Sequence, residues 1–315
     1  MIMISIGGEN LVDLVSAKTD SNGLPRYVAN PGGSPFNIAI ATGRQGQSVS
    51  YLTPISEDAL GCLLAKSLIE SNVDLAAPRV PQPTSLAVVS ITDGIPSYAI
   101  HRNSTAERQV NLPALERNMP KSTRFFHVGS LGLIDGDDAV AWEAFFERCH
   151  DKGIVTSLDP NVRPGLIAER EKYTARIHRM MHHADIFKLS EEDLLWLYPD
   201  RRLEVALKDC QADCKASLFI LTMGGDGSRL FLRDIEVAVA AQKVKHISDT
   251  IGAGDTYMAS ILCWAVENGL TSRAALSCVD AVALENAAIK AGEAAAINCQ
   301  RSGCNPPWRE ELLNI

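Results

Sequence analysis

Short apolar runs alternate with helix-like segments along most of this 315-residue chain, and this alternation constrains the fold more than any other feature. Strands that are apolar throughout are buried on both faces, and when helices connect them they pair in parallel. The sequence therefore predicts an α/β fold with a doubly wound, mostly parallel central sheet flanked by helices. The expected core strands are Met3–Gly7, Phe125–Gly129, Ile154–Asp159, Ile186–Leu189 and Leu218–Thr222. The expected helices are Pro35–Arg44, Ala59–Glu70, Val140–His150, Glu192–Tyr198, Thr256–Asn268 and Ala281–Ile297.

One region departs from this alternation. Ser85–Thr92 and Ser97–Arg102 are expected strands joined by the short turn 93–96, which is typical of a hairpin and not of a crossover helix. Together with Leu24–Asn30 they predict a small sheet that stands apart from the central one, and we interpret it as a lid over a pocket. An edge hairpin of the central sheet is the alternative.

The composition limits both the number of domains and the classes of partner. A chain of 315 residues is long enough for one large α/β domain or two smaller ones. We expect a single domain over residues 1–315, with the lid, about residues 14–30 and 84–104, inserted in it. The net charge of −8 is opposite to the basic face that nucleic-acid binding requires. No apolar stretch reaches the ~18 residues of a membrane span, and no signal peptide is recognised, so we expect a cytoplasmic protein without a membrane partner.

The eight cysteines favour the same compartment. The closest pairs, Cys210/Cys214 and Cys299/Cys304, do not have the paired CxxC spacing of a zinc site. We expect reduced thiols and no cysteine-based metal site.

Polar residues follow several of the expected strands at their carboxyl ends, where ligands of open α/β sheets bind. Because these ends meet at one edge of a parallel sheet, the residues predict a shared active face. They are Glu9 and Asp13, then Asp159, Asn161 and Arg163, then Glu191, and finally the segment 222–225.

A glycine-rich turn, Gly252-Ala253-Gly254, lies directly before Asp255 and an expected helix. Small residues at this place let backbone N–H groups converge on an anion at the positive end of the helix dipole. From the residues alone, Asp255 is equally well a helix N-cap or a base beside bound phosphates.

A second glycine-rich turn, Gly32-Gly33, precedes a helix for which we expect Ser34 as the N-cap and Pro35 in the first position. The two glycines permit positive φ angles and close approach of a ligand to the backbone. Asn37 offers a donor and an acceptor to hydroxyl groups. An ordinary glycine turn at the start of a helix is the alternative.

The segment Asp-Thr-Ile-Gly-Ala-Gly-Asp-Thr at 249–256 resembles the C-terminal signature of the PfkB (ribokinase-like) family of carbohydrate kinases. Gly-Gly-Ser-Pro-Phe-Asn at 32–37 resembles the N-terminal signature of that family, most of all in bacterial fructokinases. The resemblance implies a ribokinase-like fold and an ATP-dependent sugar kinase. The roles that it implies are the catalytic base for Asp255, the anion hole for the backbone of Gly252, Ala253 and Gly254, and sugar contacts for Gly33 and Asn37.

The same resemblance implies further substrate contacts. Asp13 matches an aspartate that grips the sugar, and Arg102 matches an arginine at the end of a lid strand. Asn161 and Arg163 match the Asp-x-Asn-x-Arg turn of fructokinases and ketodeoxygluconate kinases, which implies contacts to substrate or phosphate.

The nucleotide side is implied in the same way. Glu191 matches the glutamate that organises Mg²⁺ and its waters, whereas Lys188 stands where the family has asparagine, and we expect it to contact nucleotide phosphate. The remaining nucleotide-binding positions are Thr222, Gly224, Gly227 and Asn286.

The substrate prediction depends on Ser34. Family members that act on ribose or on phosphorylated sugars typically have lysine directly after the two glycines, so serine here favours an unphosphorylated ketose, most of all fructose. A 2-keto-3-deoxygluconate kinase, with Arg102 and Arg163 on the substrate carboxylate, is an alternative, and so is another PfkB-type sugar or nucleoside kinase. A sensor without turnover is a third, and the intact 252–255 turn argues against it. A requirement for K⁺ and a homodimer through exposed lid edges stay open.

Overall fold

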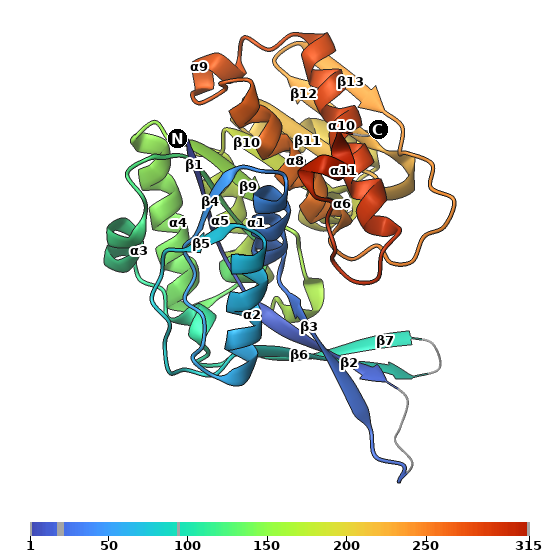
Figure 1. Ribbon diagram of the computed structural model, residues 1–315. Helices are drawn as coiled ribbons and strands as arrows, with labels where there is room; N and C mark the ends of the chain where they lie inside the picture. The colour runs from blue at the N-terminus through green and yellow to red at the C-terminus, as the bar shows by residue number, and fades with distance from the viewer. Residues whose placement is uncertain (1, 18–21, 93–94, 314–315) are drawn as a thin grey trace.

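The computed structural model describes residues 2–17, 22–92 and 95–313, and these residues contain a nine-stranded central sheet with the order β13-β12-β11-β10-β9-β8-β1-β4-β5 (Figure 1). All strands from β11 to β5 in this order run parallel, whereas β12 and β13 are antiparallel additions at one edge. The strands are β1 (Met3–Gly7), β4 (Ser48–Tyr51), β5 (Val73–Leu75), β8 (Thr123–Gly129), β9 (Val155–Asp159), β10 (Ile186–Ser190), β11 (Leu218–Thr222), β12 (Ser228–Leu232) and β13 (Ile235–Val239).

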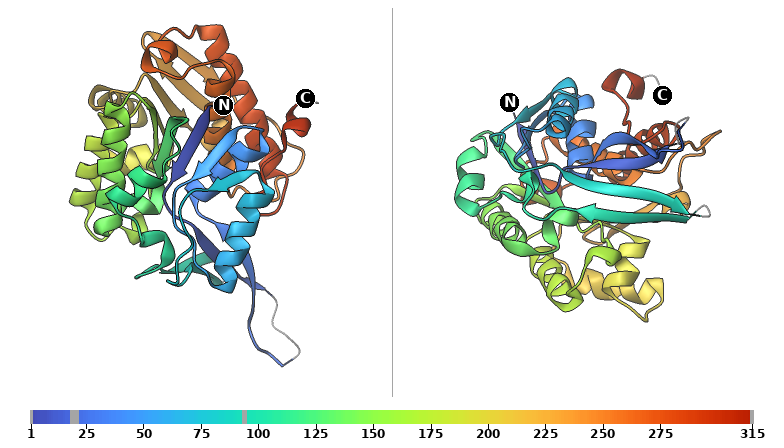
Figure 2. Two further views of the ribbon diagram at one scale, coloured as in Figure 1. Left: turned by 60° about the vertical axis from the view of Figure 1, so that its left-hand side comes forward. Right: turned by 90° about the horizontal axis from the view of Figure 1, so that it is seen from below.

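Helices cover both faces of the central sheet (Figures 1 and 2). One face packs against α1, α2, α8 and α10, and the other against α4, α5, α6 and α7, each through its own buried apolar cluster. This arrangement is the predicted doubly wound α/β fold. The helices are α1 (Ser34–Arg44), α2 (Ala59–Glu70), α3 (Leu112–Asn118), α4 (Gly136–Asp151), α5 (Arg170–Met181), α6 (Glu191–Leu197), α7 (Leu203–Asp213), α8 (Ala253–Glu267), α9 (Arg273–Leu276), α10 (Ala281–Cys299) and α11 (Arg309–Leu312). Short 3₁₀ turns are η1 (Ala106–Arg108), η2 (Ser130–Leu133), η3 (Pro164–Leu166) and η4 (Gly224–Asp226).

Strand β11 shows why the core strands are apolar throughout. Leu218 and Ile220 belong to one apolar cluster, and Phe219 and Leu221 belong to the other. Successive residues of a strand point to opposite faces, so a central strand buries every side chain. Burial of each such side chain contributes about 1.5–3 kcal/mol, which explains why these runs predicted the sheet correctly.

The predicted core strands and helices are all present, with boundaries that differ by a few residues. The largest difference is at α4, which begins at Gly136 and not at Val140. Asp137 and Asp138 lie in its first turn, where negative charge is favourable at the positive end of the helix dipole. The sequence did not predict β4, β5, β12 and β13. β4 and β5 have only four and three residues, whereas β12 and β13 have five each but are less completely buried than the predicted core strands.

A second sheet, of four strands among the described residues, has the order β3-β2-β6-β7 and projects from the main body (Figures 1 and 2). β2 and β6 are parallel, whereas β2 pairs with β3 and β6 pairs with β7 in antiparallel fashion. The strands are β2 (Leu11–Ala17), β3 (Arg26–Gly32), β6 (Ser85–Thr92) and β7 (Ile95–His101).

The small sheet confirms that the predicted hairpin is separate from the central sheet, and the edge-hairpin alternative is wrong because β6 pairs with β2. β7 begins at Ile95 and not at Ser97. The predicted turn residues Asp93 and Gly94 lie outside the described residues. The sequence did not predict β2, because its polar Asp13 was expected in a turn and lies instead within the strand.

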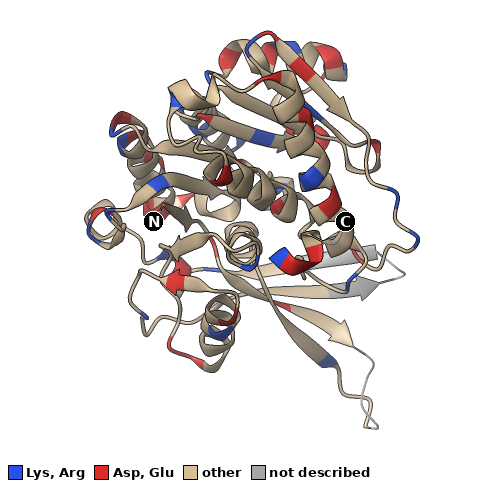
Figure 3. Ribbon diagram, turned by 45° about the horizontal axis from the view of Figure 1, so that its top comes forward, with Lys and Arg blue, Asp and Glu red and all other residues tan. Residues whose placement is uncertain are grey.

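The outer helices carry Lys and Arg interspersed with Asp and Glu (Figure 3). All eight cysteines are free thiols. In the part of the chain that the structure describes, no group of three or more His, Cys, Asp or Glu side chains is arranged to hold a metal ion. None of the helices within these described residues has both the length and the apolarity needed to cross a membrane.

Candidate active site

Asp255 lies in the first turn of α8 and its side chain is buried. The N-cap of this helix is Gly252, with a φ of 75°, so Asp255 is the third helical residue and its interpretation as an N-cap is wrong. A Cβ atom on Gly252 would lie 2.2 Å from Sγ of Cys304, and the positive φ also requires glycine. The N–H groups in the first turn of a helix lack intrahelical acceptors, which suits this turn to bind an anion beside Asp255. In this conformation the N–H of Ala253 donates to the carbonyl oxygen of Thr250 across 3.2 Å.

The start of α1 supplies both hydrogen-bond donors to the Asp255 carboxylate. Ser34 Oγ donates to Oδ1 across 2.6 Å, and Asn37 Nδ2 donates to Oδ2 across 2.8 Å. The N-cap of α1 is Gly33, with a φ of 109°, and Ser34 is the first helical residue, so the prediction of Ser34 as the N-cap is wrong. With no capping role, the Ser34 hydroxyl reaches Asp255 instead. The two glycine-rich segments of the sequence therefore meet at one carboxylate.

Glu9 holds the turn that presents Ser34. Its Oε1 accepts the backbone N–H of Ser34 across 2.9 Å, and its Oε2 lies 3.4 Å from the N of Gly132. Burial raises the pKa of Glu9 to about 7, although the hydrogen bond from Ser34 lowers it. The side chain is a buried acceptor at the amino end of α1.

Asp13 and the glycine pair lie against one another. Oδ2 of Asp13 is 2.5 Å from the place where a Cβ on Gly32 would lie, and a Cβ on Gly33 would lie 2.9 Å from the carbonyl oxygen of Glu9. Gly33 therefore requires glycine, both for space and for its φ of 109°, whereas a Cβ atom on Gly32 would displace the end of the Asp13 side chain. Burial raises the pKa of Asp13 to about 6. The structure thus places a second partly buried carboxylate beside the turn that carries Ser34 and Asn37.

A buried ion pair lies on the other side of the α8 turn. Nζ of Lys188 donates to Oδ2 of Asp159 across 2.6 Å, with side-chain exposures of 5% and 1%. The same Nζ is 3.5 Å from the place where a Cβ on Gly254 would lie. The sequence analysis expected Lys188 at nucleotide phosphate and Asp159 at the active face, but it did not predict that the two side chains pair. The pairing of β9 with β10 could have indicated the contact, because Phe187 pairs with Leu158 directly before it.

These neighbours act on the acidity of Asp255. Burial raises the pKa of Asp255, the hydrogen bonds from Ser34 and Asn37 lower it, Asp159 raises it and Lys188 lowers it, and the net shift is upward. A carboxylate whose pKa is raised towards the working pH is a better proton acceptor than an ordinary one.

The other predicted substrate residues contact neighbouring protein groups and not the Asp255 cluster. Arg102 follows β7, and its guanidinium is paired with buried Glu107 at 3.1 Å. Asn161, with a φ of 40°, is half-buried, and Arg163 is exposed and donates to the carbonyl oxygens of Asn161 and Val162. In this conformation neither arginine is hydrogen-bonded to Asp255.

The predicted nucleotide residues are spread over the ends of β10 and β11 and over α10. Glu191 begins α6 directly after β10, and Thr222 ends β11 with its Oγ1 3.4 Å from the carbonyl oxygen of Leu189. The glycine turn that follows β11 has positive φ angles at Gly224 and Gly227. Asn286 lies exposed on α10, and the structure does not bring its side chain to the Asp255 cluster.

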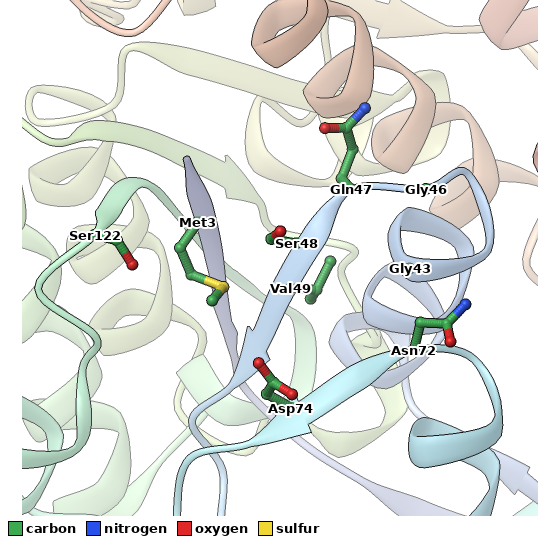
Figure 4. A pocket seen from close by; sticks show the side chains of 9 residues that line it. All are labelled: Met3, Gly43, Gly46, Gln47, Ser48, Val49, Asn72, Asp74 and Ser122. Atoms are coloured by element: carbon green, nitrogen blue, oxygen red, sulfur yellow. The ribbon is translucent and has the colours of Figure 1, made fainter. Parts of the chain in front are cut away.

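A surface hollow lies elsewhere on the molecule (Figure 4). It is lined by Met3 and Ser48, which begin β1 and β4, and by Asp74 and Ser122. These residues are at the amino ends of the parallel strands, whereas Glu9, Lys188 and the α8 turn are at the carboxyl ends. The hollow is therefore not part of the candidate active site.

Comparison with known proteins gives the same family as the two glycine-rich segments. Residues 1–311 match the profile of the pfkB family carbohydrate kinases. A fructokinase of Rhizobium leguminosarum bv. trifolii is 34% identical over 287 residues, which cover 90% of this chain and 86% of that protein. Fructokinase-1 of Oryza sativa subsp. japonica is 31% identical over 317 residues, which cover 98% of this chain and 95% of that protein.

Solved structures share the fold at lower identity. A fructokinase with bound ATP from Xylella fastidiosa has a TM-score of 0.89 at 24% identity and covers 99% of this chain and 97% of its own. A fructokinase double mutant from Vibrio cholerae O395, in a form with fructose, ADP and potassium ion bound, has a TM-score of 0.84 at 24% identity and covers 100% of this chain and 98% of its own. The predicted ribokinase-like fold is thereby confirmed.

Proposed function

This chain belongs to the pfkB family of carbohydrate kinases, and we propose that it is a fructokinase, which transfers the γ-phosphoryl group of MgATP to a hydroxyl group of fructose. The relatives at 34% and 31% identity support this substrate, since both are named fructokinases and both align with most of the chain.

The observation that supports the activity most directly is the setting of Asp255. Its buried carboxylate stands beside the anion-binding turn of α8 and is oriented by donors from Ser34 and Asn37. Asp255 accepts the proton of the sugar hydroxyl as that oxygen attacks the γ-phosphorus and the bond to the ADP oxygen breaks. The N–H groups of Gly252 and Gly254, that of Ala253 once it leaves the carbonyl oxygen of Thr250, and the positive end of the α8 dipole stabilise the charge on the phosphoryl group.

The sugar lies between the glycine pair and the small sheet. Asp13 binds hydroxyl groups through charge-assisted hydrogen bonds, which are stronger than neutral ones. Gly33 and Asn37 approach the sugar from the start of α1. Closure of the small sheet as a lid excludes water and brings Arg102 to the substrate, whereas Asn161 and Arg163 approach it from the loop that follows β9.

The nucleotide lies on the β10–β11 side of the α8 turn. Thr222, Gly224 and Gly227 border it, Asn286 lies towards its adenine, and Lys188 faces its phosphates. The Glu191 carboxylate begins α6 at this edge, and carboxylate oxygens are ligands that Mg²⁺ prefers, in this case through water. When bound, Mg²⁺ neutralises charge on the phosphates. Replacing K⁺ by Na⁺ in the assay tests whether a monovalent cation is also required.

Ser34 supports an unphosphorylated substrate. Lysine at this position would place a cation where a sugar phosphate could bind, whereas here a hydroxyl group donates to Asp255. Ser34 therefore orients the proposed base and provides no positive charge that could bind a phosphate group on the sugar.

The test is the release of ADP from MgATP over a panel of fructose, ribose, 2-keto-3-deoxygluconate, adenosine and fructose 6-phosphate. We expect fructose to give a kcat/KM at least ~10-fold above every other compound, within the ~10⁴–10⁸ M⁻¹s⁻¹ usual for native substrates. A sugar acid or nucleoside as the best substrate would contradict fructose as the acceptor and keep the kinase.

A further inference from the structure

Lys188 faces the nucleotide phosphates in the proposed function, but neither its buried pairing with Asp159 nor the phosphate group that it contacts has been assigned. We propose that Lys188 binds the terminal phosphoryl group of the nucleotide directly, and that Asp159 is the positioning residue that holds Lys188 Nζ beneath the α8 turn. This inference rests on the proposed function, since it concerns the phosphoryl group that the kinase transfers.

The position of Nζ is the first observation. It lies 3.5 Å from the place of a Cβ on Gly254, so it is adjacent to the backbone that presents N–H groups to an anion. A lysine ammonium has three donors, and the hydrogen bond to Asp159 uses one of them. The other two are available to phosphoryl oxygens held at the same turn.

The second observation is the cost of the pair. Both side chains are almost completely buried. Replacing a buried ion pair by apolar residues is often neutral or stabilising, so the stability of the fold does not account for the pair. A charged residue in this place is better explained by its proximity to the bound anion.

The third observation is that the pair is incomplete. Within the described residues, Oδ1 of Asp159 is buried and has no hydrogen-bond partner. A buried carboxylate oxygen without a donor is unfavourable, and such atoms in native structures point to a missing ligand, ion or water. Oδ1 of Asp159 can therefore accept a hydrogen bond from a donor that binds with the substrates.

The pair also acts on the base. Asp159 raises and Lys188 lowers the pKa of Asp255. Lys188 thus acts on both reactants, because the same charge that binds the phosphoryl group lowers the pKa of the neighbouring carboxyl group and favours its ionised form. Removal of Lys188 should move the acidic limb of the kcat/KM profile to higher pH, and removal of Asp159 should move it to lower pH.

The direct test is the ratio of two dissociation constants, for the Mg²⁺ complexes of AMPPNP and ADP, measured by calorimetry on the full-length protein. Lys188→Met should raise the AMPPNP/ADP ratio about 10-fold or more, because the contact to the terminal group is a charge-assisted hydrogen bond. Asp159→Asn should raise the ratio about 3-fold or more, because Nζ loses its anchor.

The double variant Asp159→Asn/Lys188→Met separates this role from a structural one, since it leaves no unpaired buried charge. We expect a melting temperature close to that of the wild type together with a raised AMPPNP/ADP ratio. A wild-type ratio in the double variant, or in Lys188→Met, would overturn the proposal. Absence of turnover with every sugar in the wild type would contradict the proposed function but not the role of Lys188. That role is decided by the AMPPNP/ADP ratio, which does not depend on turnover.

Discussion

The hydroxyl group of Ser34 donates to Oδ1 of Asp255 across 2.6 Å, although the two residues are 221 positions apart in the chain. This contact joins the residue that follows the first glycine pair to the proposed base in the second glycine-rich turn. Both helix starts are therefore parts of one site. The orientation and the acidity of the Asp255 carboxylate depend on α1 as much as on its own helix.

Replacing Ser34 by Ala should move the acidic limb of the kcat/KM profile to higher pH. The hydrogen bond from Ser34 lowers the pKa of Asp255, so its loss raises that pKa, and a hydrogen bond to a charged group is worth roughly one pH unit or more. A pH–rate profile measures the shift. Ser34→Thr keeps the hydroxyl group and should leave the limb within ~0.3 units of the wild type. An unshifted limb in Ser34→Ala would show that the hydroxyl does not act on the base.

Glu9→Gln should stabilise the protein in neutral solution and not in acid. The folded pKa of Glu9 is about 7 against 4.5 for an ordinary glutamate, so the folded state favours the protonated form. Below pH 4.5 the wild type and the variant both carry a neutral side chain at position 9, and the two proteins should be equally stable. As pH rises through 7, the free energy of unfolding of the wild type should become lower than that of Glu9→Gln by on the order of 3 kcal/mol. Urea unfolding at pH 4, 6 and 8 measures this difference, and a constant difference across these pH values would contradict it.

Gly252→Ala should reduce both stability and turnover, because the αL conformation and the contact with Cys304 Sγ both exclude a Cβ atom. Gly269→Ala is the matched control, since Gly269 also has a positive φ, 67°, but a Cβ there would meet no atom within 4 Å. Each substitution should cost about 1–2 kcal/mol for its backbone conformation. Only Gly252→Ala should also lower kcat, by about 10²-fold, because it displaces the anion-binding turn. Equal kcat values in the two variants would contradict a special role for this turn.

The sequence predicts the layers of this fold well and its contacts poorly. Runs such as Leu218–Thr222 identify central strands because burial on both faces leaves no polar positions. The two glycine-rich segments mark the helix starts that carry Asn37 and Asp255, because small residues directly before a helix are recognisable in the local sequence. The same reasoning does not predict strand β2, because β2 is only partly buried and contains the polar residue Asp13.

The sequence does not predict the hydrogen bond from Ser34 to Asp255 or the pairing of Lys188 with Asp159, and the reason differs from that for β2. Ser34 is a good N-cap by type, and only the position of Gly33 as the actual N-cap shows that the hydroxyl is free for Asp255. Lys188 and Asp159 lie on neighbouring strands 29 positions apart, so their contact follows from the strand order and not from a local pattern.

The central claim is that Asp255 is the base of a sugar kinase, and the most direct test is the kcat for ADP formation in Asp255→Asn with the best sugar of the panel. Asparagine keeps the shape of the side chain but cannot accept the proton. We predict that kcat falls by about 10²–10⁴-fold, while the melting temperature and the affinity for MgATP stay close to those of the wild type. A folded variant that retains near-normal kcat would contradict the account.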